Sequence, residues 1–367
     1  MTWIVPPELE IAVYAAAREV LGDAPLATAA LTRAIVDRSE RYTSDRDRLA
    51  KPADRTADLA ARAVFFTIAD AIKIAIPLGE LRGRDALPAP LRVLDVGAGC
   101  GALTLGLLAT VSGPVAITAL DRDADALAIA KRAVHAYRGV ELDTRTADVT
   151  KATLPPADLV VIGTLLNELP AAARLPLVER ALRAMSDAGA VILVEPALRD
   201  TTRALHELRD AILARELAHV FAPCTRRGAP CPMLANEADW CHEDRAVKLP
   251  PRTAELARLT HLRDGNLKFS YLVLRRAPAP LVAAGGTAWR VVGAPRAPKG
   301  KVELDGCSDA GLVPIRLLRR HRTPANRDVE RAHRGDVLVI DRAPGDERLE
   351  LAADTRVERI APATSST

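Results

Sequence analysis

The sequence of 367 residues is poor in aromatic side chains, in long apolar runs and in cysteine. Its three Trp, four Tyr and four Phe make up 3% of the chain, which excludes a nucleic-acid surface built mainly on base stacking. No segment reaches the roughly 18 consecutive apolar residues of a membrane span. The first 21 residues lack the basic, apolar and small-residue order of a secretion signal. We therefore expect a cytoplasmic protein without a membrane partner.

The overall composition is that of a folded protein with a sizeable core. Hydrophobic residues make up 49% and charged residues 27% of the chain, which excludes a disordered or fibrous protein. At about 100 to 200 residues per domain, the length predicts two or three domains. In a reducing compartment the five cysteines are expected to be free, metal-bound or catalytic, not disulfide-bonded.

Apolar periodicity divides the chain into regions of different structure. Residues 1–85 are expected to be a helical N-terminal region, with helices at 7–21, 26–41 and 56–81 and an exposed charged loop at 45–55. Residues 86–280 alternate between apolar runs and helical patterns, and strands are expected at 92–96, 115–120, 159–162, 191–195 and 268–274. This alternation predicts an α/β fold with a parallel sheet covered by helices on both faces.

The C-terminal part is expected to form a second, smaller unit. A long helix at 200–219 and an irregular Cys-rich insertion at 221–252 precede a linker at 277–280. Strands expected at 288–292, 301–304, 313–318 and 336–340 predict a small β domain over residues 281–345. Residues 346–367 are expected to be a polar tail.

A glycine-rich turn follows the first strand of the α/β region. The segment Asp-Val-Gly-Ala-Gly-Cys-Gly at 95–101 leads into a helix expected at 102–111, and glycines let a ligand approach the backbone closely. Asp121, at the end of the next strand, is placed to accept hydrogen bonds from a ribose, and Asp148 follows the strand after that. The spacing differs from the Gly-x-Gly-x-x-Gly pattern of dinucleotide enzymes, so a nicotinamide enzyme is the lesser alternative.

This region resembles the class I S-adenosylmethionine-dependent methyltransferases, because an Asp stands two residues before the first glycine. The resemblance implies a cofactor site formed by Asp95, Gly97, Gly99, Gly101, Asp121 and Asp148. It places Asp95 and the glycines along the methionine part, Asp121 on the ribose and Asp148 near the adenine. Cys100 within the turn is interpreted as a small filler and not as a nucleophile.

The candidate catalytic residues are Asn167 and Glu168, in the segment Gly-Thr-Leu-Leu-Asn-Glu-Leu-Pro after the fourth strand. Amino-group methylases of nucleic acids usually carry Asn/Asp-Pro-Pro-aromatic at this point, and the chain lacks that motif. The two side chains could face the sulfonium end of the cofactor, but a helix-capping role for Asn167 is an equal alternative. The sequence thus supports a methyl-donor site better than a methyl-transfer reaction.

Four further cysteines form a second group of candidate site residues. Cys224, Cys231 and Cys241 lie within 18 residues, and Cys307 lies in the next domain. Four thiolates suit an iron-sulfur cluster or a structural zinc ion. The paired Cys-x2-Cys knuckles of a zinc ribbon are absent, so buried cysteines without a metal stay open as an alternative. On a zinc ion, His242 could replace Cys307.

The same region resembles the mitoribosomal small-subunit methyltransferase-like family, which occurs in mitochondria and bacteria. The resemblance is carried by Ala-Pro-Cys-Pro around Cys231, Asp-Trp-Cys-His at Cys241 and Lys-Phe-Ser-Tyr-Leu-Val-Leu at 268–274, and it extends over roughly residues 25–340. It implies a [4Fe-4S] cluster held by Cys224, Cys231, Cys241 and Cys307, and a role in assembly of the small ribosomal subunit. Ligands from two domains would make the cluster structural and clamp the β domain to the methyltransferase core.

Positive charge is concentrated at 245–334, where 19 Lys and Arg stand against seven Asp and Glu. With few aromatic residues, such a surface fits structured RNA recognised through phosphates and 2′-hydroxyls, and no DNA partner is expected. The alternative is a solvated arginine-rich surface without a partner. The candidate RNA-binding residues are Arg226, Arg227, Arg245, Lys248, Arg319 and Arg320.

Three functions follow from these features. The first is an S-adenosylmethionine-binding, cluster-containing factor of the small ribosomal subunit that methylates ribosomal RNA. The second is a non-catalytic RNA-binding assembly module in which the methyltransferase fold has lost its activity. The third is a small-molecule methyltransferase with an accessory domain held by zinc. The missing acceptor motif favours the second, and the glycine turn with Asp121 favours the first.

Overall fold

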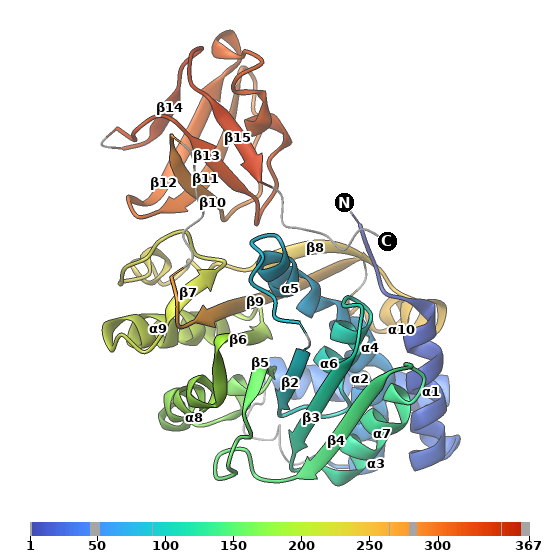
Figure 1. Ribbon diagram of the computed structural model, residues 1–367. Coiled ribbons are helices and arrows are strands. Elements are labelled where there is room, and N and C mark those ends of the chain that lie inside the picture. The colour runs from blue at the N-terminus through green and yellow to red at the C-terminus, as the bar shows by residue number, and fades with distance from the viewer. Residues whose placement is uncertain are drawn as a thin grey trace.

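The computed structural model describes residues 2–44, 52–89, 91–263, 265–278, 285–345 and 347–360. Figure 1 shows a large α/β unit and a smaller β domain, drawn in orange and red, above it. Most of the expected loop at 45–55 and the end of the expected linker at 277–280 lie outside the described residues. No helix in the described ranges is long and apolar enough to cross a membrane.

The large unit is built on a nine-stranded sheet in the order β1-β8-β9-β6-β5-β2-β3-β4, with β7 beside β9. Strands β2 to β6 pair in parallel, whereas β9 runs antiparallel to β6, β7 and β8. The five strands expected from sequence are β2, β3, β5, β6 and β9. The strand bounds are β1 (Trp3–Ile4), β2 (Leu91–Val96), β3 (Val115–Asp121), β4 (Val140–Thr146), β5 (Ala157–Gly163), β6 (Met185–Pro196), β7 (His219–Ala222), β8 (Glu243–Lys248) and β9 (Asn266–Arg275).

Helices cover both faces of this sheet, as expected for apolar parallel strands. Val93 packs toward the N-terminal helices, α6, α7 and α10, whereas the next residue, Leu94, packs toward α8 and α9. The helix bounds are α1 (Pro7–Leu21), α2 (Thr28–Thr43), α3 (Arg55–Ala61), α4 (Ile68–Ala71), α5 (Ala75–Arg82), α6 (Ala102–Leu108), α7 (Ala124–Val134), α8 (Ala171–Ala184), α9 (Arg199–Ala214) and α10 (Pro251–Thr260). The sequence therefore predicted the α/β class correctly.

The third expected N-terminal helix is present but irregular. Its α-helical segments α3, α4 and α5 are joined by a π-helical turn at Arg62–Thr67 and a 3-10 turn at Ile72–Ile74. Such turns change which residues face a neighbouring element. Here they lie beside the carboxyl ends of the parallel strands, and they direct several charged side chains toward the cleft described below.

The small β domain is a six-stranded sheet in the order β14-β12-β11-β10-β13-β15, around a core that includes the fully buried Trp289. The expected polar tail at 346–367 is wrong for its first part, because two strands of this sheet lie there. Their apolar residues, such as Leu349 and Val357, are buried in the domain core. The strand bounds are β10 (Thr287–Val291), β11 (Lys301–Ser308), β12 (Gly311–Leu318), β13 (Val337–Ile340), β14 (Leu349–Leu351) and β15 (Val357–Ile360).

Two further expectations need correction in the Cys-rich part of the chain. The helix expected at 200–219 ends at Ala214, and Glu216 takes a left-handed backbone with φ of 53° before the chain turns into β7. The insertion expected to be irregular contains β8, whose four charged residues do not show an apolar strand pattern. It is followed by α10, which begins at Pro251 as the first helical residue.

Candidate functional site

The glycine turn joins β2 to α6 at the carboxyl edge of the parallel strands. Gly97, Gly99 and Gly101 have left-handed backbones, with φ of 75°, 53° and 85°, a conformation that side chains disfavour. Asp121, at the end of β3, fixes the turn, because its Oδ2 accepts a hydrogen bond of 2.8 Å from the Gly99 N–H. Its Oδ1 accepts a second one of 2.9 Å from the Asp123 N–H. The acidic residue and the turn therefore form one unit.

The turn borders a cleft of about 710 Å³ at this edge of the sheet. Of the residues predicted to bind a cofactor, Asp95, Gly97, Gly99, Asp121 and Asp148 all line it. Gly101 is not part of the cleft lining. It packs against α7, where a Cβ added to Gly101 would lie 3.1 Å from the Ala130 Cβ. Cys100 also lines the cleft and is buried, in agreement with its interpretation as a filler.

The carboxyl groups of the cleft differ in their environments. Asp95 is buried, which raises its pKa to about 6, and it accepts a hydrogen bond of 2.7 Å from the Thr104 hydroxyl. Asp148 is exposed, and the Thr150 hydroxyl at 2.6 Å lowers its pKa. At neutral pH both are charged, so the cleft offers hydrogen-bond acceptors at two places along its length.

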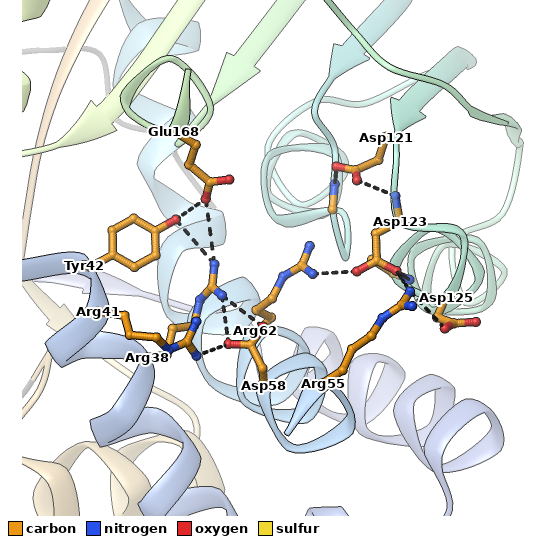
Figure 2. A network of polar contacts seen from close by, with 12 residues as sticks. Arg38, Arg41, Tyr42, Arg55, Asp58, Arg62, Asp121, Asp123, Asp125 and Glu168 are labelled. Atoms are coloured by element: carbon orange, nitrogen blue, oxygen red, sulfur yellow. Dashed lines mark hydrogen bonds and ion pairs between the residues drawn. The ribbon is translucent and has the colours of Figure 1, made fainter. Parts of the chain in front are cut away.

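The N-terminal helices close one side of the cleft with arginines, as Figure 2 shows. The Arg62 guanidinium binds the Asp123 carboxylate at 2.7 Å. It lies over the glycine turn, because a Cβ added to Gly99 would be 3.3 Å from Arg62 Nη2. Arg38 of α2 pairs with Asp58 of α3 at 2.9 Å and holds the two helices together. These arginines were not predicted from the sequence, since a helical pattern carries no signal for a distant carboxylate.

Asn167 and Glu168 follow β5 at the same edge, but each is engaged within the protein. The Asn167 side-chain amide donates to Glu195 Oε2 at 2.7 Å. Glu168 lines the cleft, accepts a hydrogen bond from the Tyr42 hydroxyl and lies 3.8 Å from Arg38 Nη2. The contacts of Glu168 hold the loop after β5 against α2 (Figure 2), and the Asn167 contact holds it to β6.

Glu195 is the buried anchor of this loop and was also missed from sequence. Its Oε1 accepts the backbone N–H groups of Leu165 and Leu166 at 3.2 and 2.9 Å. Burial raises its pKa to about 7. A charged residue at the end of a long apolar strand, as in Val-Glu-Pro at 194–196, was the available signal.

The other four cysteines line a second cavity, of about 50 Å³, away from the cleft. Cys224 follows β7, Cys231 precedes a 3-10 turn, Cys241 precedes β8 and Cys307 lies in β11 of the small domain. Burial raises the pKa of Cys231 to about 11 and that of Cys307 to about 12, and the other thiols add to both effects. The structure thus brings together four sulfur atoms that are up to 83 residues apart in the chain.

Two side chains that line this cavity each keep a buried nitrogen without a hydrogen-bond partner among the described residues: His206 Nδ1 and Arg290 Nη2. Arg209 of α9 is buried beside Cys224 and Cys231. His242 also lines the cavity, but its Nε2 faces the Arg334 guanidinium at 2.9 Å. No group of three or more His, Cys, Asp or Glu side chains that could hold a metal ion is found in the described ranges.

Contacts around this cavity join the small β domain to the large unit. The Thr225 hydroxyl donates to the Cys307 carbonyl at 2.7 Å. Arg290 of β10 is buried and donates to the Pro223 carbonyl at 2.6 Å and to Glu80 of α5 at 2.8 Å. The cysteines therefore lie where three parts of the chain meet: the N-terminal helices, the Cys-rich segment and the β domain.

Comparison with protein families gives one match that spans most of the chain. The profile described as mitochondrial small ribosomal subunit Rsm22 matches residues 58–339. The chain belongs to this family. The matched span of the Rsm22 family includes the glycine turn, Asp121, Asp148 and all four cysteines of the second cavity. The resemblance read from the sequence is thereby confirmed.

Solved structures similar to this Rsm22-family chain are distant. Magnesium protoporphyrin IX methyltransferase from Synechocystis PCC 6803, with bound SAM, is 13% identical, with a TM-score of 0.38, covering 66% of this chain and 97% of that one. The ribosomal protein L11 methylase from Lactobacillus delbrueckii subsp. bulgaricus is 19% identical, with a TM-score of 0.31, covering 41% and 69%. No curated sequence matches the chain.

The predicted RNA-binding residues of the Rsm22-family chain differ in exposure. Lys248, Arg319 and Arg320 are exposed. Arg227 is largely exposed and lies 3.9 Å from Asp309 of the β domain. Arg245 is partly buried and pairs with Glu243 at 2.7 Å, so its charge is directed into the protein. Arg226 donates to the Asp309 carbonyl at 2.8 Å and thus contributes to the domain contact.

Proposed function

We propose that the protein is an S-adenosylmethionine-binding factor of the small ribosomal subunit. The observation that carries this is the cleft of about 710 Å³, in which a three-glycine turn, a buried Asp95 and the acidic strand end at Asp121 meet. Bound S-adenosylmethionine would supply an electrophilic methyl group. Family membership supports the ribosomal context, since the family is described by the mitochondrial small ribosomal subunit.

The residues of the cleft fit the parts of this cofactor. Asp121 has two carboxylate oxygens, and each accepts one backbone hydrogen bond, which leaves lone pairs for the two ribose hydroxyls. Asp148 would lie beyond it, at the end of β4, near the adenine. The glycine backbone would lie along the methionine part, with Arg62 above it as a cation for the methionine carboxylate.

Incubation with radiolabelled S-adenosylmethionine and small ribosomal subunits tests the reaction. Cofactor binding followed by label in ribosomal RNA would support methyl transfer. Binding without transfer would support the second candidate, a non-catalytic assembly module. One observation favours that candidate: Asn167 and Glu168, the residues nearest the expected acceptor side, are engaged by Glu195, Tyr42 and Arg38.

We infer that the cysteine cavity holds an iron-sulfur cluster through Cys224, Cys231, Cys241 and Cys307. A cluster carried by four thiolates is anionic, and this fits two buried cations: Arg290, which lines the cavity, and Arg209, which lies beside Cys224. The four thiols line one cavity, and four thiolates are the ligand set of a [4Fe-4S] cluster. Broad visible absorption after anaerobic purification would support the cluster, and a colourless protein with zinc would contradict it.

We also propose that the exposed cations bind ribosomal RNA. Lys248, Arg319 and Arg320 are exposed on two structural units that contact each other around the cysteines. Phosphate contacts of this kind weaken steeply with salt. Co-sedimentation with small ribosomal subunits should therefore fall as salt rises, and equal binding at all salt concentrations would contradict the proposal.

A cytoplasmic location stays a prediction, because the family description names mitochondria.

A further inference from the structure

The cleft extends beyond the part assigned to the cofactor. The strand order β4-β3-β2-β5-β6 places Asp148 and Asp121 on one side of the glycine turn and the end of β6 on the other. At the β6 side the cleft is lined by Pro196, Leu198, Leu262, Asp70, Lys73 and Arg263. This is the side of β5 on which an acceptor would meet the methyl donor, and nothing so far assigns it a ligand.

Three charged side chains gather at this end, and their charges do not cancel. Asp70 Oδ2 lies 2.9 Å from Lys73 Nζ, and Asp70 Oδ1 lies 3.1 Å from Arg263 Nε. Two cations therefore share one carboxylate. Burial lowers the pKa of Lys73 to about 8, and the two cations lower the pKa of Asp70. Within this group two basic side chains share one acidic side chain, and Glu195 is the next acid near Lys73.

Lys73 has donors left over for a ligand. The residue is 1% exposed, and the acidic partner that its ammonium group has within the described chain is Asp70, with Nζ 2.9 Å from Oδ2. This contact occupies at most one of the three N–H donors of the ammonium group. The next carboxylate, Glu195, is occupied by Leu165, Leu166 and Asn167. A buried ammonium with unused donors is costly unless an anion completes its shell.

The backbone at both sides of this group departs from regular structure. Asp70 and Lys73 follow the π-helical turn at Arg62–Thr67, and Lys73 lies in the 3-10 turn that comes after it. Arg263 has a left-handed backbone with φ of 58°, two residues after His261 with φ of 55°. Irregular helical turns and strained residues of this kind are frequent at binding sites. Here these irregular turns place Arg263, from the segment before β9, beside Asp70 of α4, which precedes it by nearly 200 residues in the chain.

We propose that Lys73 and Arg263 bind one oxyanion, a carboxylate or a phosphate, carried by the molecule that occupies the acceptor side of the cleft. This inference rests on the proposed function, because it takes the glycine-turn half of the cleft as the cofactor half. Asp70 holds the two cations in place and leaves their outer donors free for the ligand.

Calorimetric titration of the full chain with inorganic phosphate and, separately, with sodium acetate tests the proposal, with and without S-adenosylhomocysteine. The variants are Lys73→Met and Arg263→Gln, and Arg92→Gln is the matched control, because Arg92 forms an exposed ion pair with Asp158 at the start of β2. We expect saturable one-to-one binding of one anion to the wild type. We expect it to weaken at least tenfold in both variants and by less than twofold in the control.

The two anions distinguish a phosphate site from a carboxylate site. Equal anion affinity in wild type, Lys73→Met and Arg263→Gln would overturn the proposal, as would a wild type that binds S-adenosylhomocysteine but neither anion. If Lys73→Met fails to fold, Arg263→Gln decides, since Arg263 is partly exposed and lies outside a helix. Unchanged S-adenosylhomocysteine affinity in the variants separates this site from the cofactor half. Absence of cofactor binding by the wild type would instead contradict the proposed function.

Discussion

The large cleft and the cysteine cavity differ in whether their buried polar groups have partners within the protein. In the cofactor half of the cleft, charged residues pair with each other or with backbone: Arg62 binds Asp123, and Asp121 accepts from the Gly99 N–H. Around the cysteines, raised thiol pKa values accompany buried nitrogens without partners, on His206 and Arg290. The cofactor half of the cleft is therefore preformed by the protein itself, whereas the cluster that we propose would supply the missing partners in the cysteine cavity.

The two sites also differ in what they hold together. The cleft lies within one unit, at the ends of adjacent parallel strands and the helices that cover them. The cysteine cavity takes ligand candidates from the large unit and from β11 of the small domain. Loss of a cofactor-binding side chain in the cleft should act chiefly on binding and on the local turn. Loss of a cysteine in the cavity should change the stability of the contact between the two units.

The largest effect is expected for Cys231→Ser. This change removes one of four thiolates, so we expect the metal to be lost entirely, with lower solubility and melting temperature. Cys100→Ser is the matched control, because Cys100 is also buried but lies in the glycine turn. Iron, acid-labile sulfide and zinc per chain are the measurement. A Cys231→Ser variant with full metal content would show that the assignment of ligands is wrong.

The next effect concerns the ion pair between the small domain and the N-terminal helices. Arg290→Met leaves Glu80 buried without its main partner, which should cost about 3–5 kcal/mol in the free energy of unfolding. Arg296→Met, which breaks an exposed pair with Asp305, should cost about 1 kcal/mol or less. Urea unfolding of both variants provides the comparison. Equal losses would mean that Arg290 does not join the two units.

A smaller, pH-dependent effect should arise from Glu195, the buried anchor of the loop after β5. Its pKa in the folded chain is raised to about 7 from 4.5, chiefly by burial, so the folded state binds the proton more tightly than the unfolded state. Its contribution is thus fully present below about pH 4.5 and is lost as pH rises to about 7. Relative to Glu195→Gln, wild type should lose on the order of 2 kcal/mol across this range. A pH-independent difference between the two unfolding curves would contradict this account.

The smallest effect is expected for Asp121→Ala, which acts on binding and leaves the domain contact untouched. Removing the ribose acceptor should weaken S-adenosylhomocysteine binding about tenfold, or 1.4 kcal/mol. Asp143→Ala is the control, since Asp143 lies on β4 and pairs only with Arg145 at 2.7 Å among the ion pairs found in the described chain. Calorimetry measures both dissociation constants. The same constant for Asp121→Ala and wild type would refute the placement of the ribose.

In the large unit, the sequence predicted the strands that are buried on both faces. Strands β2, β3, β5, β6 and β9 have continuous apolar runs, because helices cover both faces of the sheet. The edge strand β4 alternates between partly buried and exposed residues and was missed. Strands β8, β14 and β15 are short or rich in charge, so their pairing depends on distant partners and not on local pattern.

The residues of the candidate sites were likewise predicted only where the signal is local in the sequence. Asp95, the glycines and Asp121 are recognisable because a single turn and the next strand end bring them together. The four cysteines were found from their chemistry, although their shared cavity required the tertiary fold. Arg62 and Lys73 carry no signal in sequence, because their roles depend on partners that only the folded chain brings close, such as Asp123 for Arg62 and Arg263 beside Asp70 for Lys73. Glu195 carried a weak signal, as a charged residue at the end of an apolar strand.

Calorimetric titration of the wild-type chain with S-adenosylhomocysteine tests the central claim most directly. If the glycine turn and Asp121 form a preformed cofactor site, the titration will show saturable binding of one ligand per chain. Heats no larger than those of ligand dilution, from a protein shown to be folded, would contradict the account.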